Sequence, residues 1–238
     1  YEENSTIKLR QHGNTTTQVN LYGCTNVNNI YGGGLGDNTA DAEIAANVYG
    51  PVIVTTKGGT ARNVFGCNNL YGSPQSTVTV NIDGGTVSHD VYGGGNLANT
   101  DVSPTVNMTN GTVSKDVYGG GALANTGGST VNITGGEVTR DIYGGGLGDK
   151  ATLGEGHSDV VALVNGPVLV NIGAAPVAPS TEPTGSATIG GSVFGCNNVN
   201  GTPKGDVNVN IYQTAHTTAN TCPHITTLQE LATAADSN

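Results

Sequence analysis

Short runs in which apolar and polar residues alternate recur along most of the chain. In residues 78–82 the alternation places Val78, Val80 and Ile82 on one face and Thr79 and Asn81 on the other. Similar V-x-V-[NT] segments occur at residues 18–21, 52–55, 104–107, 129–132 and 168–171. An alternating run of this length, bounded by Gly and Asn, predicts a half-buried β-strand. The pattern therefore predicts many short strands and few helices.

A second motif, [VI]-[YF]-G-[GC], follows these runs at regular intervals. The three middle spacings between its aromatic residues are 27, 26 and 25 residues, and the longer spacings contain insertions. The aromatic residues of the motif are Tyr31, Phe65, Tyr92, Tyr118, Tyr143 and Phe194. A fixed period in this range indicates a repeat architecture, in which each unit buries its apolar face only against its neighbours.

The two motifs together predict an all-β fold, a right-handed single-stranded parallel β-helix. We expect about seven coils of 25–27 residues, stacked about 4.8 Å apart so that Val and Ile form a continuous buried column. The 38 Gly residues fit this expectation, because the corners of a narrow solenoid need tight turns and close backbone approach.

The repeat also divides the chain. We expect an N-terminal strand or edge segment at 1–16 and the β-helix at 17–212, with loop insertions at about 37–48, 149–166 and 173–185. A C-terminal cap is expected at 213–238, where Thr227 and Glu230 form a capping-box pattern before a short helix. A longer repeat is visible as well, since residues 31–37 recur at 143–149 and residues 65–69 recur at 194–198.

The phrases V-Y-G-G-G-N-L, I-x-G-G-T-V and T-V-N-I carry a resemblance. They resemble the Gly-rich repeats of large bacterial cell-surface proteins, including adhesins with pectate-lyase-like β-helices. The resemblance implies an extracellular or cell-surface location and a role in adhesion or fibre formation. Its implied partners are other copies or neighbouring domains of the same surface protein, and host or microbial glycans. It transfers no catalytic residue to this chain.

Charge and hydropathy exclude two classes of partner. The net charge is −10, from 8 Lys and Arg against 18 Asp and Glu, so the phosphates of nucleic acid would be repelled. No apolar run approaches the roughly 18 residues of a membrane-spanning helix. We therefore expect neither nucleic-acid binding nor membrane insertion.

One polar position of the repeat has two interpretations. Polysaccharide lyases on parallel β-helices use a basic residue beside a carboxylate, so a sugar-acid site would fit. Alternatively, each acid caps a turn and the basic residues reduce repulsion between stacked acids. Strict repetition favours this ladder and predicts that the chain has no catalytic residue. The residues at this position are His89, Lys115 and Arg140, followed by Asp90, Asp116 and Asp141.

Two further groups of residues each have a functional and a structural interpretation. Asp37 and Asp149 end a G-G-L-G-D phrase similar to Ca²⁺-binding repeats, but the phrase lacks the spacer before Asp, which favours a simple turn. No cofactor is expected, and Ca²⁺ is the alternative. The column that contains Tyr31, Tyr92, Tyr118 and Tyr143 is either a sugar-stacking platform or a ladder of rings stacked on one another.

Cys196 and Cys222 lie one coil apart, at a spacing of 26 residues. If the register continues past residue 211, their Cα atoms come within reach of a disulfide bond.

Two function classes stay open for the chain as a whole. The first is a structural or adhesive solenoid, and the alternative is a carbohydrate-binding or polysaccharide-degrading, lyase-like β-helix.

Overall fold

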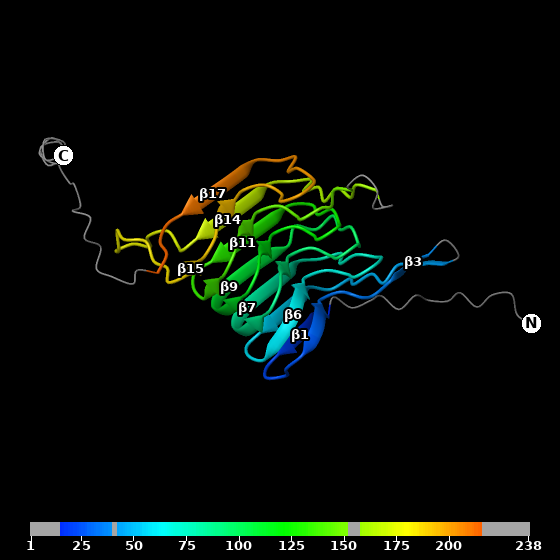
Figure 1. Ribbon diagram of the computed structural model, residues 1–238, viewed down its shortest axis with the longest axis horizontal. Helices are drawn as coiled ribbons and strands as arrows, with labels where there is room; N and C mark the ends of the chain where they lie inside the picture. The colour runs from blue at the N-terminus through cyan, green and yellow to red at the C-terminus, as the bar shows by residue number, and fades with distance from the viewer. Residues whose placement is uncertain (1–14, 40–41, 152–157, 216–238) are drawn as a thin grey trace, which may run out of the picture.

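The computed structural model describes residues 15–39, 42–151 and 158–215. These residues form strands without helices, and one 15-stranded sheet contains nearly all the strands. The strands of successive repeats pair in parallel throughout this sheet, and Figure 1 shows them stacked side by side along the molecule. The predicted parallel β-helix is therefore confirmed.

The longest strands form one face of the solenoid, which we call the long face. Neighbouring strands pair in register, so that Val54, Val80, Val106, Val131, Val170 and Val209 occupy one column. Seven strands contribute, one from each coil, as the repeat predicted. They are β1 (Thr17–Leu21), β5 (Val52–Thr56), β7 (Val78–Val87), β9 (Thr105–Val113), β11 (Ser129–Ile133), β14 (Val168–Ile172) and β17 (Val207–Ile211).

The second face, which we call the aromatic face, contains the [VI]-[YF]-G-[GC] motif. Its strands are β2 (Val27–Tyr31), β6 (Thr60–Phe65), β8 (Val91–Tyr92), β10 (Val117–Tyr118), β13 (Ile142–Tyr143) and β16 (Val193–Phe194). Between the two faces, the end of β7 pairs with the end of β9, which pairs with β12 (Glu137–Val138). β12 pairs in turn with β15 (Thr188–Ile189).

The core lies inside the coil and consists of the inward half of each alternating run. On the long face, Val54, Val80, Val131 and Val170 are completely buried. Burying a Val or Ile side chain fully stabilises a fold by about 1.5–3 kcal/mol. Because every coil contributes such residues to the same columns, each coil is stabilised mainly by the coils on either side of it.

Glycine occupies one corner because of its backbone conformation. Gly59, Gly85, Gly111 and Gly136 each directly precede the register-paired residues of four successive coils, and their φ angles are 76°, 75°, 85° and 80°. This left-handed region disfavours side chains other than Gly. The G-G-T-V phrase therefore marks a turn that recurs once in each coil.

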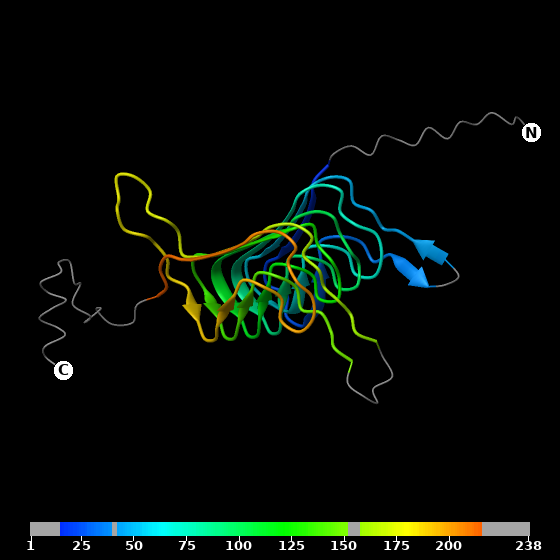
Figure 2. The ribbon, with the colours of Figure 1, turned by 90° about the horizontal axis from the view of Figure 1, so that it is seen from above.

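The three predicted insertions leave the stack as hairpin-like excursions, and they project from it in Figure 2. The first contains β3 (Asp37–Thr39) and β4 (Ala42–Ile44), which pair antiparallel. Antiparallel bridges close the other two, between Asp149 and Val160 and between Ala174 and Thr184. The predicted N-terminal strand and C-terminal helix fall at 1–14 and 216–238, outside the described residues.

Candidate functional site

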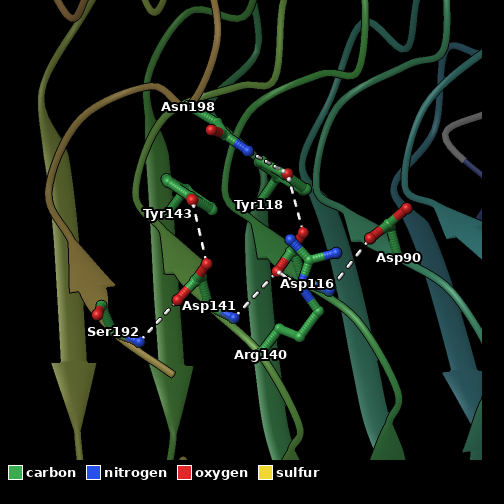
Figure 3. A network of polar contacts seen from close by, with 8 residues as sticks. All are labelled: Asp90, Asp116, Tyr118, Arg140, Asp141, Tyr143, Ser192 and Asn198. Atoms are coloured by element: carbon green, nitrogen blue, oxygen red, sulfur yellow. Dashed lines mark hydrogen bonds and ion pairs between the residues drawn. The ribbon is translucent and has the colours of Figure 1, made fainter. Parts of the chain in front are cut away.

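The strongest concentration of polar side chains lies just before the aromatic strands, where three aspartates form an acidic ladder. Asp90 Oδ1 accepts a hydrogen bond from the backbone N–H of Asp116 at 3.1 Å. Asp116 Oδ1 accepts one from the N–H of Asp141 at 3.0 Å, and Asp141 Oδ1 accepts one from Ser192 at 2.7 Å. Figure 3 shows this chain of bonds. Each carboxylate therefore links its own coil to the next one.

The second carboxylate oxygen is used as well. The hydroxyl of Tyr118 donates to Asp116 Oδ2 and that of Tyr143 donates to Asp141 Oδ2, both at 3.3 Å (Figure 3). Tyr118 in turn accepts a hydrogen bond from Asn198 Nδ2 at 2.8 Å. Burial raises the pKa of the Tyr118 hydroxyl, which therefore stays protonated and able to donate at neutral pH.

This pairing matches the choice of Tyr or Phe at five of the six aromatic positions. Phe65 and Phe194 follow Asn63 and Ser192, which carry no carboxylate two residues earlier. Tyr92, Tyr118 and Tyr143 each follow an aspartate at that spacing. The sequence signal for this contact is therefore Asp-x-Tyr, which joins the acidic position of the repeat to its aromatic position. Tyr31, which follows Asn29, is the exception.

A basic row, formed by Arg62, His89, Lys115 and Arg140, runs beside the acidic ladder. The backbone N–H groups of the last three each donate to the carbonyl of the preceding row member, at 2.8, 3.1 and 3.3 Å. Arg140 Nε lies 3.6 Å from Asp116 Oδ1, and its side chain is exposed whereas that of Asp116 is buried. Arg140 thus lies outside Asp116 and offsets its charge, an arrangement that fits a ladder.

Mutual proximity of the acids has an electrostatic effect. The pKa of Asp90 is raised, chiefly by burial, and the neighbouring charge of Asp116 adds to the rise. The hydrogen bond from the Asp116 backbone and the charges of Lys115 and His89 act in the opposite direction. Like charges stacked one coil apart therefore depend on the basic row for compensation.

A groove lies between this corner and the loops that follow the aromatic strands. Its volume is about 430 Å³, and Arg62, His89 and Lys115 line it together with Tyr92 and Asp149. His89 Nδ1 is buried without a hydrogen-bond partner. An imidazole, two cations and a carboxylate in one groove are groups that bind sugars through hydrogen bonds and charge.

The aromatic residues form a continuous ladder of stacked rings. Neighbouring centroids are 4.8–5.0 Å apart, with interplanar angles of 7–10°. Tyr92, Tyr118 and Tyr143 are at most 7% exposed, and other rings cover both of their faces. A sugar ring has no free face to stack on at these three positions. Among the described residues, Tyr31 and Phe194, at the two ends of the ladder, each stack on one ring.

The chain has no significant match among protein-family models, curated proteins or solved structures. Among the described residues, none lies in a helix that is long and apolar enough to cross a membrane. The function must therefore be argued from the residues of this chain.

The two Ca²⁺ candidates lie in separate insertions. Asp37 Oδ1 accepts a hydrogen bond from the backbone N–H of Thr39, and Asp149 Oδ1 accepts one from Lys150, both at 2.9 Å. These bonds are typical of turns. Within residues 15–39, 42–151 and 158–215, no three His, Cys, Asp or Glu side chains are grouped to hold a metal ion. Calcium binding at Asp37 or Asp149 stays a prediction.

Of the two cysteines expected to pair, only Cys196 lies in the described part of the chain, where it is exposed. Cys222 lies outside it, so the disulfide bond stays a prediction. Cys67, the counterpart of Cys196 in the earlier repeat, is completely buried. Burial raises the pKa of its thiol to about 12, which makes it a poor nucleophile.

An asparagine ladder on the outside of the long face was not predicted as a bonded network. The amide Nδ2 of each residue donates to Oδ1 of the preceding one, at 2.9–3.0 Å. Aligned amides polarise one another, so such a row strengthens cooperatively. The signal for it is the fixed Asn of the V-x-V-N segments. Its members are Asn81, Asn107, Asn132, Asn171 and Asn210.

Proposed function

We propose that this chain is an extracellular structural and adhesive module of a bacterial surface protein or fibre, without catalytic activity. The observation that carries the proposal is the acidic ladder. Asp116 and Asp141 have both carboxylate oxygens hydrogen-bonded, to a backbone N–H of the next coil and to a tyrosine hydroxyl. A carboxylate used in this way holds coils together and is poorly placed to take a proton from a substrate.

The chemistry of the other repeated positions supports the same proposal. Asparagine amides bond from coil to coil, and aromatic rings stack from coil to coil. A catalytic site is usually a single constellation that departs from its scaffold, whereas these contacts recur once per coil. Repeated contacts along one axis favour length and rigidity, which are the properties of a spacer or a surface fibre.

Adhesion and turnover can be measured on the same purified chain. Beads coated with the folded chain are expected to attach to bacterial or host cells more strongly than beads coated with the heat-unfolded chain. Incubation with a panel of acidic polysaccharides is expected to release no unsaturated sugar product. Product release that Lys115→Ala abolishes, with Lys204→Ala as the matched control, would replace the proposal with a lyase.

A second candidate, carbohydrate binding without turnover, is favoured by the groove beside the basic row. The Arg62 guanidinium and the Lys115 ammonium line that groove and could donate hydrogen bonds to a sugar acid. A glycan array with the parent chain and an Arg62→Ala/Lys115→Ala variant tests this candidate. Signals present for the parent and lost in the variant, but kept in Lys204→Ala, would support binding in the groove.

A further inference from the structure

The last coil exposes side chains whose counterparts in the preceding coil are buried. On β17, Val207, Val209 and Ile211 are 38%, 39% and 62% exposed. Their register partners on β14, Val168, Val170 and Ile172, are completely buried. Phe194, on the aromatic face of the same end, is 44% exposed. We call the surface formed by Phe194, Val207, Val209 and Ile211 the C-terminal end.

The bonded ladders stop at this end as well. In the described part of the chain β17 pairs with β14 alone, which leaves one row of its N–H and C=O groups without strand partners. Asn210 donates its amide to Asn171, but among the described residues nothing continues the asparagine ladder beyond it. An apolar strip beside an open strand edge is a template for one more strand.

The first coil presents the residues that such a strand would need. Pairing of β1 with β5 places Val19 in the apolar column of Val209, and it places Asn20 in the column of Asn210. The described part of β1 has a free edge of its own, because β5 is its one partner there.

Charge does not protect either end. Natural sheets usually guard an open edge with Lys, Pro, a bulge or an inward-pointing charge. Here β1 and β17 carry no charged residue, and residues 15–36 carry none at all. Residues 191–215 contain only Lys204 and Asp206, which cancel. The net charge of −10 is therefore carried elsewhere in the chain, and the two end coils do not repel each other.

We propose that the C-terminal end binds the first coil of a second copy of this chain, head to tail. In this arrangement β1 of the second copy adds in parallel to β17. The contact continues the two long-face columns, with Val19 on Val209 and Asn20 beside Asn210. The two contacting surfaces differ, so the contact does not close on itself and generates an open filament. This inference rests on the proposed function as a fibre-forming surface module.

The size of the full chain as a function of concentration tests the proposal. Light scattering and sedimentation are expected to show a monomer that grows into multimers as the concentration rises. Val209→Lys is expected to keep the chain monomeric, because the ammonium group would be buried under the docked coil. Thr130→Lys adds the same charge on the outside of a middle coil and is expected to assemble like the parent. Circular dichroism checks that both variants retain the fold.

A cross-link identifies the surfaces. In a chain whose own cysteines are replaced by Ala, Asn20→Cys and Asn210→Cys together are expected to give a ladder of disulfide-linked multimers on oxidation. In-register parallel neighbours lie about 4.8 Å apart, within the roughly 4.4–6.8 Å Cα separation of disulfides. Either substitution alone is expected to give no cross-link, because head-to-tail contact never brings two equivalent residues together.

A chain that stays monomeric and uncross-linked at every concentration would overturn the head-to-tail contact. Slow amide exchange over Val207–Ile211 in that monomer would show that the chain covers its own end. If the monomer still mediates attachment of coated beads to cells, the adhesive function survives without self-assembly. If attachment fails as well, the proposed function falls with it.

Discussion

One five-residue phrase occurs twice, as Phe65–Asn69 and as Phe194–Asn198, with the same five residues and different surroundings. Phe65 is 4% exposed and Cys67 is completely buried. Phe194 is 44% exposed, and Cys196 is exposed too. The ring of Phe65 stacks on both Tyr31 and Tyr92, whereas within the described residues Phe194 stacks on Tyr143 alone.

Contacts with the preceding coil are the same in both copies. Asn68 Nδ2 donates to the carbonyl of Ala46, and Asn197 Nδ2 donates to that of Ala162. The contacts that differ are those that the following coil supplies. The comparison shows that the following coil determines how deeply a residue is buried in this fold. The sequence around the residue does not specify that contribution.

Thiol reactivity should show the largest difference between the two copies. After reduction, Cys196 is expected to react with an aromatic disulfide reagent orders of magnitude faster than Cys67. Cys67 is buried and the pKa of its thiol is raised to about 12, so it reacts only when the fold opens locally. Peptide mapping of the labelled chain gives the two rates. Equal rates would mean that Cys196 is covered or that the fold around Cys67 opens freely.

Removing the aromatic ring should be the next largest effect. Phe65→Ala removes a buried ring stacked on both faces and is expected to cost about 3–5 kcal/mol in the free energy of unfolding. Phe194→Ala removes a half-exposed ring with one neighbour and should cost about half as much. Denaturant unfolding of the two variants measures both values. A larger loss for Phe194→Ala would contradict the comparison.

The glycine after each of these rings allows a finer test. A Cβ on Gly66 would meet the carbonyl oxygen of Gly93 in the next coil, whereas one on Gly195 would meet only the side chains of Val207 and Val209. Gly66→Ala is expected to destabilise the fold by about 3 kcal/mol, at the upper end of overpacking costs, and Gly195→Ala by about 1 kcal/mol. Thermal unfolding at matched concentration checks the order.

The smallest effect concerns charge in the middle of the stack. The pKa of Asp90 is raised in the fold. Between the unfolded and the folded pKa, the native state therefore binds a proton at Asp90 that the unfolded chain has lost. Its contribution to stability therefore decreases as the pH rises from the unfolded pKa through the folded one.

Asp90→Asn should remove this decrease and give a slightly higher melting temperature at neutral pH, with no gain in strong acid. The amide keeps an acceptor for the Asp116 N–H, as Asn63 already does for Asp90. Asp101→Asn, at an exposed position, is the control and should show no such pH-dependent gain. A lower melting temperature for Asp90→Asn at neutral pH would contradict the electrostatic account.

Much of the fold could be predicted because its signals are local. The V-x-V-N runs gave the strands of the long face, since a period of two places Val78 and Val80 together wherever the strand lies. The acidic ladder could be recognised from the repetition of Asp90, Asp116 and Asp141. The hydrogen bonds of the ladder could not be predicted, because a carboxylate that accepts a hydrogen bond from the next coil has no signal in the sequence of its own coil.

Non-local features explain the rest. Nothing in the phrase around Phe194 distinguishes it from that around Phe65, so the open end follows only from what lies beyond it. The reach of Asn68 into the first insertion depends on the path of the loop that contains Ala46. The groove beside His89 likewise depends on loops from several coils. Such features arise from stacking, and a repeat pattern alone does not describe them.

Parallel stacking also determines how this chain would respond to mechanical tension. The strands run across the solenoid axis, so a pull along that axis loads the hydrogen bonds of one coil at a time, starting at an end. A coil contributes about 4.8 Å to the length of the stack. Its 25–27 residues extend to roughly 90 Å once pulled free. A surface protein built this way would lengthen in discrete steps under load and keep its remaining coils intact.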